Sequence, residues 1–365
     1  MFSQRVKSID ISGIRKMFEG AGTKAINLGL GQPDFDTPEH IKRAAIDAIN
    51  EGFTGYTANL GIPELREALC RKFRRENRFT VEPNEIIITS GASEALHLAL
   101  QALVDKGDEV LIPDPGFVSY SALTTMAGGR VVGVPLGREL TLKSGAVNEC
   151  INPKTRALII NSPSNPAGTV ETRQEIKALA EIAEDNNITI ISDEVYEHFI
   201  YEGEHVSPAQ FTDNVITINA VSKTYAMTGW RIGYAAARKD YIEQMLKVHQ
   251  YIQACACSIS QKAALAAIEG PQECVSEMRE SFRARRDFLL EGLSEIGIKC
   301  VKPRGAFYAF PEVEDENAAQ KLLEKGVIVV PGTAFGEHGK GHIRISYATS
   351  GENLRKAIGV MEKVL

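Results

Sequence analysis

Residues 215–237 read VITINAVSKTYAMTGWRIGYAAA. The apolar run Val215–Val221 is followed at once by Ser222 and Lys223, and a second apolar run covers Ile232–Ala237. A continuous apolar run with β-branched residues is typical of a strand that is buried on both faces of a parallel sheet. A lysine at the end of such a strand is poorly placed for a solvated surface charge. The stretch therefore predicts an α/β sheet and a functional lysine at its edge.

Further apolar runs alternate with helical patterns over residues 38–270. Thr37-Pro38-Glu39 predicts a helix start capped by threonine, and Gly52 predicts the end of that helix. Thr172-Arg-Gln-Glu175 is a capping box that predicts a helix over Gln174–Asp185. The other predicted strands are Ile86–Thr89, Glu109–Ile112, Val131–Val134, Ala157–Asn161 and Thr189–Ser192. This alternation predicts an α/β fold with a mostly parallel sheet flanked by helices.

After Pro271 the pattern changes to that of a smaller α+β unit. Its predicted elements are a long charged helix over Glu273–Ile296, a helix near Glu316–Lys325, and strands at Gly305–Phe310, Val327–Val330 and His342–Ser346. We therefore predict a large domain at 38–272 and a discontinuous small domain formed by 1–37 and 273–365. A site is expected where the two domains meet.

The composition is that of a compact globular protein. The 365 residues include 41 Lys and Arg against 47 Asp and Glu, and 44% are hydrophobic. A nucleic-acid-binding protein is usually more basic than this, so no nucleic-acid partner is expected. The sequence has no secretion signal and no apolar stretch of about 18 residues, which predicts a cytoplasmic protein without a membrane segment.

The cysteines, histidines and clustered basic residues favour structural roles. Six scattered cysteines predict free, buried thiols in a reducing compartment. Cys255-Ala-Cys257 is followed by no second pair of Cys or His at metal-binding spacing, and the two glycines of His338-Gly-Lys-Gly-His342 predict a loop, so no metal is expected. The basic run Arg71–Arg75, on a helix that begins at Pro63, predicts a solvated face because acidic residues accompany it.

Three further loops follow predicted strands. Ser90-Gly91-Ala92-Ser93 opens a helix with small residues, which leaves backbone N–H groups available to a phosphate. Asn161-Ser-Pro-Ser-Asn165-Pro-Ala-Gly168 holds Asn165 in a stiff turn, and Ser192-Asp193-Glu194-Val195-Tyr196 brings a carboxylate and a phenol to a strand end. Read singly, these are also an ordinary capped helix, an Asn-Pro turn and an Asp cap.

Lys223 and its neighbours make the chemistry more specific. Desolvation and a nearby cation lower the pKa of a lysine, which makes its amine a nucleophile for a carbonyl group. Arg231 and Ser222 are suited to a phosphate, through a guanidinium fork and a hydroxyl.

Together and in this order, the motifs resemble those of the class I and II aminotransferases, pyridoxal phosphate enzymes of fold type I, nearest their bacterial and archaeal aspartate/aromatic branch. The resemblance extends from Leu28-Gly-Leu-Gly31-Gln-Pro-Asp-Phe-Asp to Arg344-Ile-Ser-Tyr347. Ala220 is a small departure, because the family often has serine or glycine two residues before Ser222.

The resemblance implies roles for particular residues. The implied cofactor-binding residues are Ala92, Ser93, Ser222 and Arg231 at the phosphate, Asn165 and Tyr196 at the ring 3′-oxygen, Asp193 at the ring nitrogen, Phe117 stacked on the ring, and Tyr56 reaching the phosphate from the partner subunit of a homodimer. Lys223 would form the internal aldimine and move the proton, with Asp193 and Tyr196 as further catalytic residues. Arg344 would bind the substrate α-carboxylate, with Gly31 and Asn165 beside it.

Other classes are less well supported. A nicotinamide dehydrogenase would need a third glycine where Gly29-Leu-Gly31-Gln-Pro-Asp34 has aspartate. A regulator built on this fold would need a DNA-binding segment, and residues 1–37 show no helix-turn-helix pattern. A pyridoxal phosphate lyase or synthase would use the same cofactor residues and stays open.

The implied reaction moves an amino group from an L-amino acid to a 2-oxo acid by a ping-pong mechanism. Overall resemblance favours aspartate as donor and 2-oxoglutarate as acceptor. Dicarboxylate-specific relatives often have an additional cation, but here Ser93 stands in the phosphate loop and Val248–Gln261, aligned with the partner's segment, has no Lys or Arg. A neutral or aromatic donor such as alanine or tyrosine therefore stays open.

Overall fold

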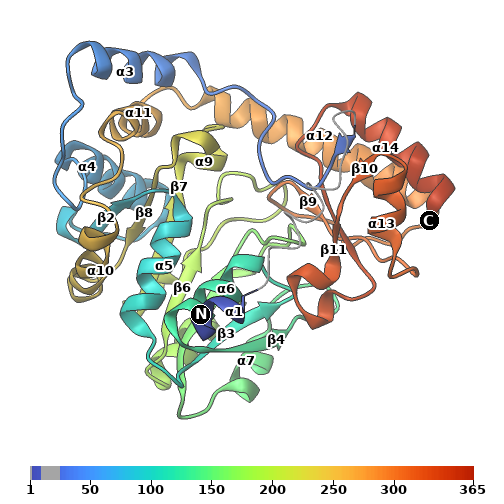
Figure 1. Ribbon diagram of the computed structural model, residues 1–365, viewed down its shortest axis with the longest axis horizontal. Coiled ribbons are helices and arrows are strands. Elements are labelled where there is room, and N and C mark those ends of the chain that lie inside the picture. Colours follow the sequence, from blue (N-terminus) through green and yellow to red (C-terminus); the bar gives the residue numbers. More distant parts are fainter. Residues whose placement is uncertain (1, 10–24) are drawn as a thin grey trace.

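The computed structural model describes residues 2–9 and 25–365, and its larger part is built on one central sheet (Figure 1). The seven strands lie in the order β2-β8-β7-β6-β5-β3-β4, and all neighbouring pairs are parallel except those formed by β8. The strands are β2 (Ile86–Thr89), β3 (Glu109–Asp114), β4 (Arg130–Pro135), β5 (Thr155–Asn161), β6 (Thr189–Asp193), β7 (Val215–Ala220) and β8 (Gly233–Ala236). The predicted α/β fold and its seven strands are confirmed, with strand ends that differ by one or two residues.

Helices cover both faces of this sheet because successive strand residues point to opposite sides. Ile191 and Ile218 pack with α5 and α10, whereas Leu158 and Ile190 pack with α8 on the other face. The helices of this part are α3 (Glu39–Asn50), α4 (Pro63–Lys72), α5 (Ala92–Leu103), α6 (Val118–Ala127), α7 (Ser144–Cys150), α8 (Arg173–Asp185), α9 (Val221–Thr224), α10 (Lys239–Ile252) and α11 (Ser258–Glu269). The short helix α1 (Gln4–Lys7) contacts α6.

The remaining elements form two small sheets and three helices (Figure 1). In one sheet, β1 (Ile26–Asn27) is parallel to β10 (Val327–Ile328). The other sheet is antiparallel and consists of β11 (Val330–Pro331), β12 (Ile343–Ser346) and β9 (Tyr308–Ala309). The helices are α12 (Glu273–Glu295), α13 (Ala318–Glu324) and α14 (Gly351–Val364). The predicted strand over Gly305–Phe310 is thus only two residues long, and Val327–Val330 divides between two sheets. Residues 1 and 10–24 of the predicted small domain lie outside the described residues.

Two predicted helix caps differ from the structure. Thr37 does not cap α3: the cap position is Pro38, and the Thr37 hydroxyl donates to the Ala226 carbonyl at 2.8 Å. Thr172 does cap α8 by accepting from the Glu175 N–H, but the Glu175 carboxylate accepts from the Ser144 N–H at 3.0 Å instead of completing the box. In both cases the side chain of Thr37 or Glu175 bonds to a segment distant in sequence instead of to its own helix start.

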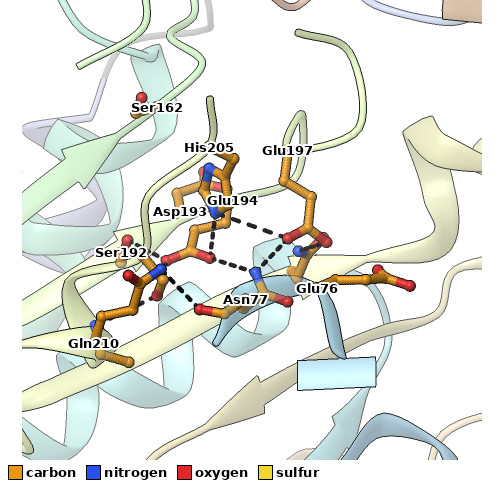
Figure 2. Close-up of polar contacts among 12 residues, drawn as sticks. Glu76, Asn77, Ser162, Ser192, Asp193, Glu194, Glu197, His205 and Gln210 are labelled. Atoms are coloured by element: carbon orange, nitrogen blue, oxygen red, sulfur yellow. Dashed lines mark hydrogen bonds and ion pairs between the residues drawn. The ribbon is translucent and has the colours of Figure 1, made fainter. Parts of the chain in front are cut away.

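The prediction of a solvated face for the basic run Arg71–Arg75 is wrong at Lys72. Lys72 is 2% exposed, and its ammonium pairs with Glu197 and donates to Asn77 Oδ1 at 2.7 Å. Figure 2 shows Asn77, Glu194, Glu197 and His205 of the same buried network, next to Asp193. Acidic neighbours in sequence are compatible with a surface helix, but here the balancing carboxylate comes from a distant segment.

The prediction of buried thiols is also wrong in part. All six cysteines are free, as expected, yet five are half-buried and Cys257 is exposed. The predicted loop between His338 and His342 is confirmed: His338 contacts Asp114, and His342 stacks on Phe310. Within residues 2–9 and 25–365, none of the helices combines the length and apolarity that crossing a membrane requires.

Candidate active site

A cavity of about 240 Å³ lies at the carboxyl ends of β5, β6 and β7, where open α/β sheets bind ligands. Most residues that the sequence singled out line it: Gly31, Ala92, Ser93, Phe117, Asn165, Asp193, Tyr196, Ser222, Lys223, Arg231 and Arg344. Tyr56 does not line it. Leu30, Tyr120 and Tyr308 line the cavity as well, although sequence reasoning missed them.

Asp193 is the last residue of β6 and is buried. Burial raises the pKa of its carboxyl group to about 6, and a hydrogen bond from the Tyr120 hydroxyl, at 2.8 Å, opposes that rise. Tyr120 lies on α6, one helical turn after Phe117, and the two rings meet edge to face. This i, i+3 spacing was the available sequence signal for Tyr120.

Lys223 lies on the one-turn helix α9, directly after β7. Its ammonium donates to the Gly31 carbonyl at 2.6 Å. Burial, followed by the charges of Arg231 and Arg344, lowers the pKa of Lys223 to about 8. Near neutral pH the neutral amine, which a nucleophile or base requires, is therefore far more populated than it is for a lysine in water.

The start of α5 and Arg231 form a site for an anion. Ala92 and Ser93 open α5, where the first backbone N–H groups have no helical acceptors. Arg231 lies across from them in a left-handed conformation, and a Cβ added to Gly91 would lie 2.2 Å from its Nη2. Gly91 itself has a φ of +80°, so glycine is required for both conformation and space. Ser222 completes this end of the cavity.

Arg344 on β12 lies at another side of the cavity and is 1% exposed. Its Nη1 donates to Asn165 Oδ1 at 2.9 Å, and its Nη2 donates to the Gly29 carbonyl. Its Nε has no hydrogen-bond partner among the described residues. A buried guanidinium with an unpaired N–H is suited to a carboxylate ligand.

Tyr196 and Asn165 reach the cavity from two adjacent strand ends. The Tyr196 hydroxyl lies 2.8 Å from that of Tyr308, and the rings are edge to face. The Asn165 backbone N–H donates to Asn161 Oδ1 at 2.8 Å, which holds the turn after β5. Both side chains thus have a supported position at the cavity wall.

Tyr56 lies outside the cavity, and 89% of its surface is exposed. Its neighbours contact the stretch that the sequence aligned with a partner segment: Thr57 donates its N–H to Cys255 Sγ, and Asn59 donates to the Ala254 carbonyl at 2.5 Å. Tyr251, in the same stretch, is 88% exposed. Within one chain, Tyr56 therefore has no contact with the other predicted site residues.

The residue types around the cavity fit pyridoxal phosphate. A helix start with a guanidinium suits its phosphate, the Asp193 carboxylate suits its ring nitrogen, and the buried Lys223 amine suits its aldehyde. The Arg344 guanidinium suits the carboxylate of an amino acid. Fold and site together define a pyridoxal phosphate-dependent enzyme of fold type I.

Comparisons with known proteins agree with this class. Residues 23–361 match the family described as aminotransferase class I and II. The chain is 50% identical to a probable aspartate aminotransferase of Methanocaldococcus jannaschii, over 100% of both chains. It is 42% identical to aromatic-amino-acid aminotransferase 2 of Thermococcus litoralis, over 100% of this chain and 98% of that protein. The solved structure of Thermus thermophilus aspartate aminotransferase with maleate matches with a TM-score of 0.96 at 43% identity, over 100% of both chains.

The chain belongs to the class I and II aminotransferase family, and it is a transaminase that depends on pyridoxal phosphate. The predicted family, enzyme class and cofactor are confirmed.

Proposed function

We propose that this transaminase takes the amino group of L-aspartate and passes it to 2-oxoglutarate in two half-reactions on one site. The observation that carries the proposal is the position of buried Arg344 in the same cavity as Lys223 and Asp193. A carboxylate-binding fork, a base and a carboxylate for the ring nitrogen are the groups that removal of an α-proton needs. Two of the three relatives named above, those of Methanocaldococcus jannaschii and Thermus thermophilus, are named as aspartate aminotransferases, which supports aspartate as the donor.

The cofactor would be held by residues of the large sheet. Ala92, Ser93, Ser222 and Arg231 would bind its phosphate, Asp193 its ring nitrogen, Asn165 and Tyr196 its ring oxygen, and Phe117 the face of its ring. When bound, pyridoxal phosphate supplies an electron sink that stabilises negative charge at the substrate Cα. Asp193 keeps the ring nitrogen protonated only while its own carboxyl group is ionised, so the Tyr120 hydrogen bond supports this role.

Lys223 would hold the cofactor covalently until substrate replaces it, and its Nζ would then take the proton from Cα. Its lowered pKa makes the neutral amine available for that transfer. Arg344 would bind the α-carboxylate through its guanidinium group, with Asn165 and the Gly31 backbone beside it. This fork fixes the direction in which Cα presents its proton.

We further propose the predicted domain division, with the large domain at 38–272 and the small domain at 1–37 and 273–365. The pairing of β1 with β10, with the Ile26 N–H donating to the Gly326 carbonyl at 2.8 Å, supports assigning the described part of 25–37 to the small domain. A homodimer is proposed in which Tyr56 reaches the partner's phosphate site. Free cysteines support a cytoplasmic location.

A neutral or aromatic donor is the second candidate, and the cavity wall supplies an observation in its favour. Its lining includes three cations, Lys223, Arg231 and Arg344, each with a proposed task, and no further Lys or Arg among the described residues. Leu30, also in the lining, is 45% exposed and offers an apolar surface to a side chain. Residues 248–261 contain no Lys or Arg that a partner could contribute.

The test is the absorbance spectrum of the cofactor-loaded enzyme before and after L-aspartate, L-alanine or L-tyrosine, with no acceptor present. We expect aspartate to convert the lysine-bound cofactor into its amine form fastest. Faster conversion by alanine or tyrosine would show that aspartate is not the preferred donor. A loaded enzyme that none of the three donors converts would contradict the proposed half-reaction. Arg344→Lys is the matched control and should slow every donor, because a point charge replaces a fork.

A further inference from the structure

Tyr308 reaches the cavity from the small antiparallel sheet. It opens β9, pairs in register with Ser346 of β12, and is 1% exposed. Its hydroxyl lies 2.8 Å from that of Tyr196, which follows β6 of the central sheet. A hydrogen bond between two hydroxyls therefore links the two parts of the molecule at the cavity.

Space around the Tyr308 hydroxyl is tightly restricted. A Cβ added to Gly31 would lie 2.1 Å from Tyr308 Oη, and the Gly31 carbonyl accepts the hydrogen bond from Lys223. The Arg344 guanidinium lies over the Tyr308 ring, 4.7 Å from the ring centre. The packing thus holds the hydroxyl against Tyr196.

The proposed role of Tyr196 makes Tyr308 the donor of this bond. Besides these two tyrosines, the charged and titratable groups that line the cavity are Tyr120 from α6, Asp193 from β6, Lys223 from α9, Arg344 from β12, and Arg231. Burial raises the pKa of both tyrosines, and the Arg344 charge opposes the rise at both, so each hydroxyl keeps its proton near neutral pH. Each hydroxyl has only one proton to give, so a Tyr196 hydroxyl that donates to the cofactor accepts the hydrogen bond from Tyr308.

We infer that Tyr308 is a positioning residue that donates its hydroxyl proton to Tyr196 and so directs the Tyr196 proton into the cavity, toward the ring oxygen of the bound cofactor. This inference rests on the proposed role of Tyr196. Hydrogen bonds in a chain polarise one another, so Tyr308 strengthens the bond that Tyr196 makes. A stronger hydrogen bond stabilises negative charge on the ring oxygen of the cofactor. That oxygen shares a proton with the Lys223 nitrogen linked to the cofactor, and the shared proton is then bound less tightly.

The experiment is a pH titration of the cofactor absorbance in the loaded enzyme without substrate. Tyr308→Phe keeps the ring that packs on Arg344 and removes only the hydroxyl. We expect the midpoint of the spectral transition to rise by about half to one pH unit, the size of one hydrogen bond expressed in pKa. Tyr347→Phe, which removes a buried hydroxyl that donates to the Ala306 carbonyl away from the cavity, should leave the midpoint unchanged.

Two further variants separate a relay from a packing effect. If Tyr308 acts through Tyr196, the double variant Tyr196→Phe/Tyr308→Phe should have the same midpoint as Tyr196→Phe alone. Gly31→Ala should raise the midpoint as well, because its methyl group would displace the Tyr308 hydroxyl. An unchanged midpoint in Tyr308→Phe, or a double variant that shifts beyond Tyr196→Phe, overturns the inference. A wild-type enzyme whose bound cofactor shows no titration would instead contradict the proposed role of Tyr196.

Discussion

Burial acts in opposite directions on the two ionisable side chains that meet at the cavity. It raises the pKa of Asp193 to about 6 and, with Arg231 and Arg344 adding to the effect, lowers the pKa of Lys223 to about 8. Both shifts disfavour the charged form, as expected where water is excluded. Between these two values, an ionised Asp193 coexists with a growing fraction of neutral Lys223.

Tyr120→Phe tests whether the Tyr120 hydroxyl helps to keep the Asp193 carboxyl group ionised. Loss of the hydroxyl removes the hydrogen bond that opposes the rise in the Asp193 pKa, so the carboxyl group should stay protonated to a higher pH. We expect the acidic limb of kcat/KM for the first half-reaction to move upward by about one pH unit. Stopped-flow measurements from pH 5 to 9 would show the shift.

The control is Tyr241→Phe, because the Tyr241 hydroxyl bonds Asn214 and Thr189, which do not line the cavity. Its acidic limb should coincide with that of the wild type. If Tyr120→Phe also coincided with the wild type, Tyr120 would have no influence on the ionisation of Asp193.

Between elements, buried charges join α4 to the ends of β6 and β7. Lys72, the last residue of α4, pairs with Glu197, which also accepts from Asn219 on β7 at 2.7 Å. Glu194, next to Asp193, accepts from Ser192 and Ser207 and pairs with His205 at 2.8 Å (Figure 2). These contacts hold the strand ends from which the proposed catalytic residues extend.

Lys72→Met tests this connection. Burial alone would raise the pKa of Glu197, but the charges of Lys72, His198 and His205 lower it to about 2. Removal of the ammonium leaves a buried carboxylate without its main partner, and we expect a loss of about 3–5 kcal/mol in the free energy of unfolding at pH 7. Urea unfolding would measure it. Lys262→Met, which breaks an exposed pair with Glu64, should cost no more than about 1 kcal/mol.

The pH dependence provides a second check on the same pair. A carboxyl group with a depressed folded pKa contributes stability above its unfolded value of 4.5, and that contribution is lost as the pH falls toward about 2. The difference in stability between wild type and Lys72→Met should therefore shrink as the pH falls below 4.5. A difference that is equally large at pH 3 and pH 7 would contradict the assigned pairing.

For the whole molecule, the position of Tyr56 predicts shared sites. Its side chain is exposed and does not line the cavity of its own chain. If it completes the partner's phosphate site, a subunit with Tyr56→Ala and a subunit with Lys223→Ala should form a heterodimer with one intact site. Random reassociation of the two variants should restore about a quarter of wild-type activity, since half of the dimers are mixed and each has one intact site of two.

Activity of the mixture is compared with that of each variant alone and with a mixture of Tyr251→Ala and Lys223→Ala. Tyr251 is equally exposed but has no proposed task in the site. The mixture of Tyr56→Ala and Lys223→Ala could instead be no more active than the average of the two variants alone. That result would place Tyr56 outside the partner's site.

Much of the fold was predictable because its signals are local. Buried strands are continuous apolar runs, and Asp193, Asn165 and Lys223 follow directly after such runs, so their place at one sheet edge could be inferred from topology. Helix starts were less predictable: Thr37 and Glu175 bond to distant segments rather than to their own helix ends.

The sequence by itself determined the α/β fold, the family and the residue types of the site, because strand periodicity and the residues after each strand are properties of short segments. Only the tertiary structure decided which other side chains contact the site residues and hold them in position. Tyr120 meets Asp193 across 73 residues, Tyr308 meets Tyr196 across 112, and Lys72 meets Glu197 across 125. No short-range pattern encodes such contacts, because they exist only after packing has brought separate elements together and excluded water from between them.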